Sequence, residues 1–259
     1  MYSVTTRAKM TKQPRGGYLK LSNFTKTPMG SPQLPNDEEN IHASIIGMVV
    51  EYLTKVIQGC DKKKAFQISL EGADRAESAG VKNAVKDAKA LLAGITGSDD
   101  LSIINACKLA TFDVWFRSPL EAMGAKTYQE TNPDKPTIEN IRALVERSLA
   151  FFEAYGDVVQ YGFTFEPYGY TDVVSSGDGD FLTADTLWDF KVLKTEPAPK
   201  HTLQLLMYWI MGKHSGQKVY ENIKSIGFFN PRLNMVYTLE ISSISKALIS
   251  EIEEKVICY

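Results

Sequence analysis

The segment 177–208 (GDGDFLTADTLWDFKVLKTEPAPKHTLQLLMY) constrains the fold of this chain more than any other part of it. Within it, residues 187–192 (LWDFKV) alternate large apolar and charged side chains, a pattern typical of a β-strand. Successive strand side chains point to opposite faces, so Asp189 and Lys191 share one face and the apolar side chains pack behind them. The pattern therefore predicts a strand that carries a carboxylate and an ammonium group side by side.

A second strand is expected just before the first. Residues 183–186 (TADT) form a turn-like sequence, and folding back at this point places Asp180 beside Asp189. Gly177 and Gly179 precede this strand, and either glycine would permit a bulge or an unusual backbone angle. The segment therefore predicts a short hairpin that brings two carboxylates together.

Two carboxylates beside a lysine have a recognisable chemistry. Mg²⁺, or the similar Mn²⁺, takes oxygen ligands, usually one or two carboxylates completed by water and substrate phosphate. Lys191 can then orient the attacking water or stabilise the negative charge that develops during the reaction. The alternative is an ordinary ion pair of the sheet. Spacing alone does not decide, because acid-x-Lys occurs three more times without an acidic hairpin, at Asp61-Lys62-Lys63, Asp87-Ala88-Lys89 and Glu253-Glu254-Lys255.

An apolar helix is expected after the hairpin. Every residue of 203–211 is apolar or aromatic except Gln204, so this helix is expected to be buried nearly all round. Gln204 and Tyr208 are four residues apart and share a face. Lys200 and His201 lie on the same side one turn earlier, and we expect them to contact nucleic acid. The helix thus presents either a polar stripe toward the hairpin or a core glutamine that binds a backbone carbonyl.

The order of these motifs resembles the PD-(D/E)XK nuclease superfamily, specifically its RecB-like branch. The resemblance rests on Gly177-Asp178-Gly179-Asp180, Asp189-Phe190-Lys191 and Gln204-Leu205-Leu206-Met207-Tyr208, the last being the only Gln-x-x-x-Tyr of the chain. It implies that Asp180 and Asp189 hold the metal and that Lys191 assists catalysis. It further implies that Gln204 and Tyr208 position DNA or the catalytic elements. The implied activity is a Mg²⁺- or Mn²⁺-dependent deoxyribonuclease, exonuclease-like, in recombination, repair or phage DNA processing, with a helicase or recombinase as partner.

The sequence offers two further candidate metal ligands, each with an alternative interpretation. The family usually has a helix with a glycine and, four residues later, a histidine or an acid near the metal; here Gly47 and Glu51 fit that pattern. However, the apolar stripe of residues 41–57 lies roughly opposite Glu51, so a solvated glutamate is an equal alternative. Asp178 shares a strand face with Asp180 and is either a metal ligand or a partner of one.

Composition excludes several classes of protein. The three cysteines, Cys60, Cys107 and Cys258, are far apart and include no C-x-x-C, so a four-thiolate iron–sulfur cluster within the chain is not expected. Their odd number and scatter favour reduced thiols in a cytoplasmic protein. The net charge of −2 does not by itself indicate nucleic-acid binding, although a local basic channel matters more for such binding than the net charge of the chain. No apolar run is long enough for a membrane span, and the oligomeric state stays open.

These observations predict an α/β fold with a restriction-endonuclease-like mixed central sheet at about 157–241, flanked by the Glu51 helix, the Gln204 helix and a terminal helix at 243–257. Residues 1–16 are expected to form a flexible basic tail. The remaining residues 17–259 are expected to form a single nuclease-like domain with a helical insertion at about 74–156. A short strand is expected at 64–70.

Three classes of function remain open at this point. The first is an active metal-dependent deoxyribonuclease. The second is a nucleic-acid-binding protein that keeps the nuclease fold without cleavage, although intact Asp180, Asp189 and Lys191 argue against it. The third is an interaction domain that binds no nucleic acid and whose acidic hairpin is structural.

Overall fold

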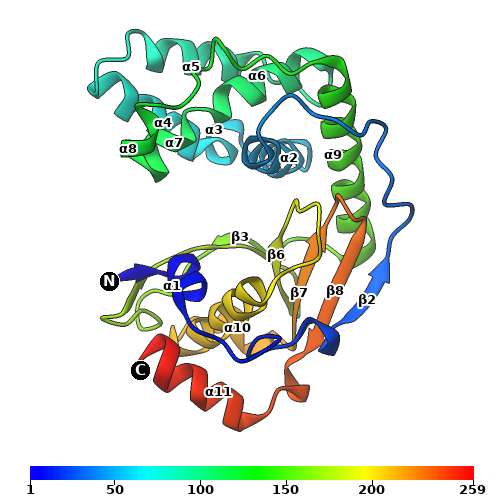
Figure 1. Ribbon diagram of the computed structural model, residues 1–259, viewed down its shortest axis with the longest axis vertical. Helices are drawn as coiled ribbons and strands as arrows, with labels where there is room; N and C mark the ends of the chain where they lie inside the picture. Colours follow the sequence, from blue (N-terminus) through cyan, green and yellow to red (C-terminus); the bar gives the residue numbers. More distant parts are fainter. The chain divides into compact units, whose positions relative to one another are not determined.

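The computed structural model describes residues 1–259, and the chain separates into two compact units (Figure 1). The sheet unit comprises Met1–Pro32 and Phe151–Tyr259, and the helical unit comprises Gln33–Ala150. The long helix α9 (Lys135–Tyr155) contributes residues to both. None of the helices combines the length and the hydropathy that a membrane span needs.

A mixed six-stranded sheet forms the centre of the sheet unit. Its strands run in the order β2-β8-β7-β6-β5-β3, and only the β6–β7 pair is parallel. They are β2 (Thr25–Pro28), β3 (Gln160–Phe163), β5 (Gly179–Leu182), β6 (Thr186–Phe190), β7 (Ser225–Asn230) and β8 (Met235–Glu240). A separate parallel pair joins β1 (Tyr2–Ser3) to β4 (Val174–Ser176). The predicted mixed sheet flanked by helices is confirmed at this coarse level.

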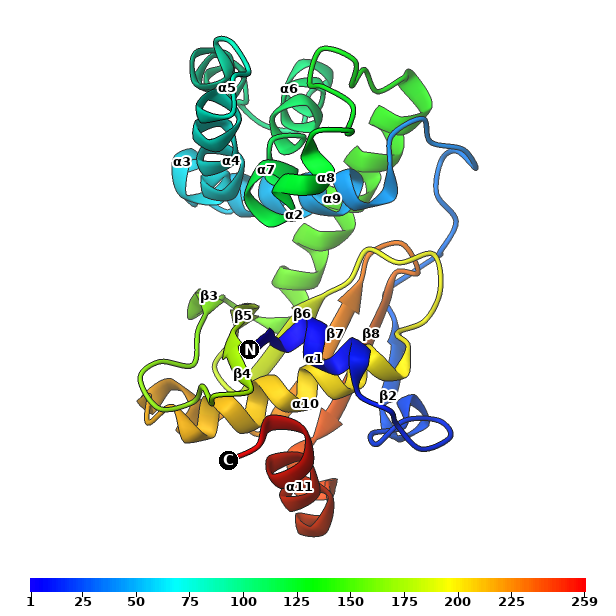
Figure 2. The same cartoon turned by 60° about the vertical axis from the view of Figure 1, so that its left-hand side comes forward.

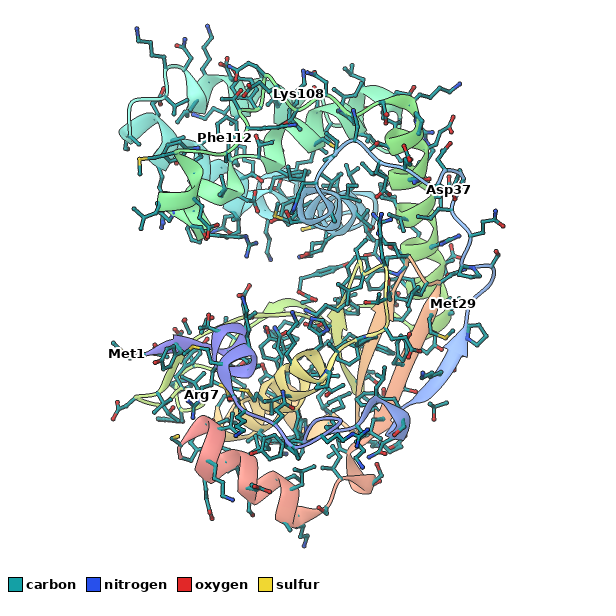
Figure 3. All side chains as sticks on the ribbon, in the orientation of Figure 1. Met1, Arg7, Met29, Asp37, Lys108 and Phe112 are labelled. Carbon is teal, nitrogen blue, oxygen red and sulfur yellow. The ribbon has the colours of Figure 1, made fainter.

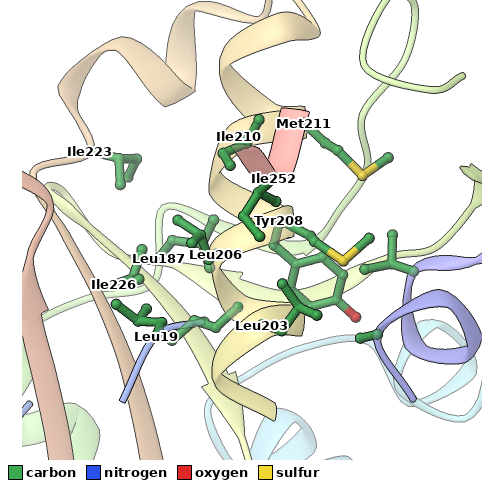
Figure 4. Close-up of a cluster of buried hydrophobic side chains, with 14 of the residues drawn as sticks. Leu19, Leu187, Leu203, Leu206, Tyr208, Ile210, Met211, Ile223, Ile226 and Ile252 are labelled. Carbon is green, nitrogen blue, oxygen red and sulfur yellow. The ribbon is translucent and has the colours of Figure 1, made fainter. Parts of the chain in front are cut away.

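The two faces of the sheet bury different clusters. One face packs on α10 (Pro199–His214), where Leu187 and Ile226 of the sheet meet Leu203 and Leu206 of the helix (Figure 4). The other face carries Trp188 among aromatic and aliphatic partners, namely Phe151, Phe152, Phe181, Phe229 and Val236. This division follows from the strand alternation of residues 187–192, and it places Asp189 on the α10 face.

The N-terminal segment is ordered, so the prediction of a flexible tail at residues 1–16 is wrong. Residues Val4–Met10 form helix α1, whose N-cap Ser3 accepts a hydrogen bond from the Thr6 N–H. Val4 and Ala8 are buried against the core of the sheet unit. Arg7 lies on this helix (Figure 3), and its guanidinium donates to the carbonyl of Val256 at 2.8 Å. The prediction relied on the basic residues of this segment and overlooked Val4 and Ala8, which are four residues apart and share one face of the helix.

The C-terminal part follows the predicted order closely. Strands β7 and β8 pair as an antiparallel hairpin, followed by α11 (Lys246–Ile252) and a π-helical turn (Glu253–Ile257). Short 3₁₀ turns complete the sheet unit at Leu21–Asn23, Lys218–Asn222 and Ile241–Ser243. The predicted terminal helix at 243–257 is therefore confirmed, with its first regular turn at Lys246.

The helical unit contains the Glu51 helix and begins well before the insertion expected at 74–156. Its helices are α2 (Ala43–Ile57), α3 (Lys62–Ala65), α4 (Gln67–Ser78), α5 (Ala84–Ala93), α6 (Asp100–Ala110), α7 (Asp113–Arg117) and α8 (Pro119–Ala122), with the first part of α9. Helix α2 packs with α3 and α6 in this unit (Figure 2). It joins them through a buried face that includes Ile46, Val50 and Leu53.

The strand expected at 64–70 is wrong, because this segment is helical. The Asp61 carboxylate accepts hydrogen bonds from the N–H groups of Lys63 and Lys64 and so caps α3. Helix α4 follows directly, and its buried face includes the small residues Ser69, Gly72 and Ala73. The local alternation of residues 64–70 is overridden by the cap and by packing against α5 and α7.

Candidate active site

The acidic hairpin forms as its sequence predicts. Strands β5 and β6 are antiparallel neighbours in which Phe181 pairs with Trp188 and Leu182 with Leu187, a register that sets Asp180 opposite Asp189. Asp180 Oδ2 accepts a hydrogen bond from the Phe190 N–H at 2.5 Å. The Asp180 carboxylate is thereby held against the edge of β6, next to Asp189.

Asp189 and Lys191 form a close ion pair on the α10 face. Lys191 Nζ lies 2.8 Å from Asp189 Oδ2 and 3.1 Å from Oδ1. The Asp189 side chain is 3% exposed and that of Lys191 is 20% exposed, so the carboxylate is desolvated while the lysine side chain keeps some access to solvent. A buried carboxylate such as that of Asp189 needs an ionic or hydrogen-bonding partner, and Lys191 is that partner here. The partly exposed Lys191 lies between Asp189 and the solvent from which a ligand would approach.

Helix α10 turns its two motif residues toward this hairpin. The Gln204 amide nitrogen donates to the Tyr208 hydroxyl at 2.6 Å and to Thr5 Oγ1 at 3.0 Å. Burial raises the pKa of Tyr208 well above its ordinary value, and the negative charges of Asp189 and Asp180 raise it further. Tyr208 therefore lies within electrostatic reach of both carboxylates. The amide nitrogen of Gln204 thus binds two side chains and not a backbone carbonyl, so the alternative of a core glutamine on a carbonyl is wrong.

The first turn of α10 adds a neutral imidazole and one lysine beside the site. His201 Nδ1 accepts a hydrogen bond from the Ala198 N–H at 2.9 Å. Burial, followed by the positive charges of Lys191 and Lys200, lowers the pKa of His201 to about 4. The imidazole is therefore neutral at pH 7, and because Nδ1 accepts, Nε2 carries the proton. Lys200 is exposed on the same turn.

The two further candidate ligands, Asp178 and Glu51, lie in different units of the chain. Asp178 is exposed just before β5, and its charge contributes to the raised pKa of Tyr208, so it belongs to the same neighbourhood. Glu51 belongs to the helical unit, where its carboxylate lies 2.6 Å from Lys55 Nζ. Its role as a metal ligand stays a prediction.

The donor set is compatible with a hard divalent cation. Asp180 and Asp189 offer carboxylate oxygens on adjacent strands, with Asp178 nearby, and oxygen is the donor that Mg²⁺ and Mn²⁺ prefer. No group of three or more His, Cys, Asp or Glu side chains is arranged to hold a metal by itself. A cation at this site would therefore complete its shell with water and substrate oxygens, as Mg²⁺ usually does.

Two supporting residues escape prediction from the sequence. Thr5 reaches Gln204 from the segment expected to be a flexible tail, and no local pattern signals that contact. Asn230, which is fully buried, accepts from the Leu193 N–H at 3.3 Å and donates to the Leu193 carbonyl at 2.9 Å. It thereby fixes the loop that follows Lys191. A polar amide at the end of an apolar strand was the available signal for Asn230.

No protein-family model, curated protein or solved structure matches this chain. The properties of the site therefore come from its own side chains: an acidic pair on two strands, a lysine bound to one member of the pair, and a Gln–Tyr pair on the covering helix.

Proposed function

We propose that this protein is a metal-dependent deoxyribonuclease with a restriction-endonuclease-like fold of the RecB-like PD-(D/E)XK type. The observation that carries the proposal is the buried Asp189 carboxylate, which is paired with Lys191 at 2.8 Å and faces Asp180 across the hairpin. Gln204 and Tyr208 of α10 are hydrogen-bonded to one another, and Tyr208 lies within electrostatic reach of both carboxylates. The proximity of these five residues supports the proposal.

The chemistry follows from the donor set. Asp180 and Asp189 would hold Mg²⁺ or Mn²⁺, which supplies charge neutralisation at the scissile phosphate and lowers the pKa of a bound water. Lys191 supplies a fixed positive charge beside Asp189, suited to orienting a water or to stabilising the charge that develops on phosphate oxygens. Because Lys191 is more exposed than Asp189, its ammonium can exchange its contact with the carboxylate for a contact with substrate.

The helix α10 would serve substrate binding. Lys200 offers a positive charge to a DNA phosphate, and the neutral His201 offers an Nε2–H donor. Gln204 and Tyr208 are hydrogen-bonded to one another, and the pair would help to position the substrate or the carboxylates within electrostatic reach of Tyr208. The pathway (recombination, repair or phage DNA processing) and a helicase or recombinase partner are part of the same proposal.

Cleavage assays with matched variants test the proposal. Purified protein is incubated with linear duplex, circular duplex and single-stranded DNA in the presence of Mg²⁺, Mn²⁺ or EDTA. We expect divalent-dependent cleavage that falls about 10²-fold or more in Lys191→Ala and Asp189→Ala, the usual loss when an electrostatic group of an active site is removed. The matched controls are Lys194→Ala and Asp185→Ala, which remove exposed charges from the same hairpin and the loop after it.

The substrate forms separate the remaining possibilities. Cleavage of linear but not circular DNA supports the exonuclease-like assignment, whereas cleavage of both indicates an endonuclease. Metal-dependent cleavage that survives both site variants contradicts the site. Salt-sensitive DNA binding without cleavage indicates a nuclease-fold protein that only binds nucleic acid. The absence of both favours an interaction domain with a structural acidic hairpin.

A further inference from the structure

The helical unit contains a cavity of about 800 Å³ that the proposed nuclease chemistry does not use. Its wall is formed by the start of α2, by the α6–α7 segment and by the loop after α8, all elements of one unit (Figure 2). A volume of this size is typical of sites for small organic ligands, and it is far larger than a single inorganic ion needs. The side chains of the wall indicate which ligand it suits.

One wall carries an arginine that is fixed from behind. Arg117 Nε lies 3.6 Å from Asp113 Oδ2, and its terminal nitrogen donates to the Tyr52 hydroxyl at 3.4 Å. The Asp113 carboxylate is 1% exposed, whereas the Arg117 side chain is 54% exposed and lines the cavity. Arg117 therefore has one part held in the protein and another part open to a ligand.

The carboxylate behind this arginine is itself fully supported. Asp113 accepts hydrogen bonds from the Ser69 hydroxyl at 2.5 Å and from the Tyr52 hydroxyl at 2.6 Å. Burial raises the pKa of the Asp113 carboxyl, and the two hydroxyl donors and Arg117 oppose that shift. These donors come from α2 and α4, so Asp113 and the guanidinium that it orients are tied to three helices. Such preorganisation favours recognition of an anion by arginine.

The rest of the wall has three kinds of side chain. Lys126 adds a second positive charge, Ile45, Met48 and Val114 supply apolar surface, and Glu39 and Glu130 supply carboxylates. The two cations suit the oxygens of a phosphate, the apolar surface suits a planar uncharged base, and the carboxylates suit the hydrogen-bond donors of a sugar or an exocyclic amine. The ligand class that combines these parts is a nucleotide.

We propose that this cavity binds a nucleoside monophosphate unit, with Arg117 and Lys126 on the phosphate and Ile45, Met48 and Val114 against the base and sugar. The unit can come from a free nucleotide or from the phosphorylated end of a DNA strand, which present the same chemistry. This site is separate from Asp180, Asp189 and Lys191, so its occupancy does not depend on the nuclease activity.

Calorimetric titration of the 259-residue chain with dAMP in EDTA, which prevents metal-dependent cleavage, tests the proposal. We expect binding to weaken at least about tenfold in Arg117→Gln, the loss expected for a charge-assisted contact, and severalfold in Lys126→Ala. Lys135→Ala, which removes an 85% exposed charge of the same unit that does not line the cavity, is the matched control. Ala125→Trp, an exposed position on the wall, fills the cavity without touching Asp113. This fourth variant keeps the test valid if Arg117→Gln disturbs folding.

Two further probes identify the source of the phosphate. Fluorescence anisotropy compares a 5′-phosphorylated oligonucleotide with its 5′-hydroxyl form; a preference for the phosphorylated strand that Arg117→Gln removes assigns the site to strand ends. Binding of dAMP without that preference assigns it to free nucleotides. Binding of neither, or binding unchanged by Arg117→Gln, Lys126→Ala and Ala125→Trp, overturns the proposal, as does equally tight binding of inorganic phosphate alone.

The nuclease hypothesis fails or succeeds separately. Asp189→Ala should leave the dAMP affinity unchanged within twofold, because Asp189 belongs to the sheet unit. Loss of cleavage with retained dAMP binding supports both proposals, and loss of dAMP binding in Asp189→Ala contradicts the independence of this site.

Discussion

Thr5 and Gln204 lie 199 residues apart in the chain and are joined by a hydrogen bond of 3.0 Å between Thr5 Oγ1 and Gln204 Nε2. The same amide nitrogen donates to the Tyr208 hydroxyl, so the amide is held from two sides. Helix α1 is fixed in turn, because Val4 is fully buried and packs on Gly177, where an added Cβ would come within 2.8 Å of Val4. The N-terminal helix is therefore a structural part of the candidate active site.

Replacement of Thr5 should change activity more than stability. Thr5→Val keeps the shape and removes the acceptor, and loss of one neutral hydrogen bond, about 0.5–1.5 kcal/mol, should lower the rate of DNA cleavage roughly three- to tenfold. The Tm should change little, since Thr5 is exposed. Thr5→Ser keeps a hydroxyl and should recover most of the rate. Equal rates for the valine and serine variants would show that this contact does not position Gln204.

Divalent cations should stabilise the protein through Asp180 and Asp189. A ligand that binds only the folded state at a hundredfold excess over its Kd contributes about 2.7 kcal/mol, which should raise the Tm by roughly 5 °C or more. Differential scanning fluorimetry with Mn²⁺ or Mg²⁺ measures this shift, and excess EDTA should reverse it. Asp180→Asn and Asp189→Asn should abolish it because each removes a charged ligand.

The control for the metal prediction is Lys194→Ala, whose Tm shift with Mn²⁺ should equal that of the wild type. A shift that persists in both asparagine variants would place the cation elsewhere.

Gly179 is required by the close approach of an aromatic ring. A Cβ added at Gly179 would lie 1.8 Å from Phe163 Cζ, and the fully buried Phe163 has little room to retreat. Gly179→Ala should therefore destabilise the sheet unit by about 1–3 kcal/mol, the usual cost of overpacking, measured by urea denaturation. Gly97→Ala, where an added Cβ meets nothing within 4 Å, should change stability by less than about 0.5 kcal/mol. Equal effects at the two positions would contradict this account.

The hairpin and α10 were predictable because their signals are local. Strand alternation fixed the faces of Asp189 and Trp188, and helical spacing placed Gln204 with Tyr208. The position of Asp180 opposite Asp189 needed only the turn between them. The positions of these side chains can therefore be predicted from sequence neighbours only a few residues away.

The contributions of distant segments could not be predicted in the same way. The basic residues around α1 resemble a solvated tail, and its order depends on Val4 and Ala8 meeting a core formed more than 150 residues later. The helix at 67–78 likewise depends on packing: a Cβ at Gly72 would lie 2.0 Å from the Phe112 carbonyl oxygen, a contact that no local pattern encodes. Arg117 of the cavity becomes informative only once Asp113 and Tyr52 stand behind it.

His201 should make the stability of the sheet unit sensitive to mildly acidic pH. Its folded-state pKa is lowered from 6.5 to about 4 by burial first and then by Lys191 and Lys200. Between these values the unfolded chain binds the proton more readily, so the free energy of unfolding should fall as the pH drops from about 6.5 toward 4. Above pH 6.5 both states are neutral, and this contribution to stability is fully retained.

His201→Asn isolates this effect, because the Asn side-chain oxygen can accept the Ala198 N–H in place of Nδ1 but does not titrate. Urea denaturation at pH 7.5 and at pH 5 should show a smaller loss of stability on acidification in this variant than in the wild type. His42→Asn, at an exposed position of the helical unit, controls for the loss of a histidine. The same pH dependence in His201→Asn and wild type would show that a different group is responsible.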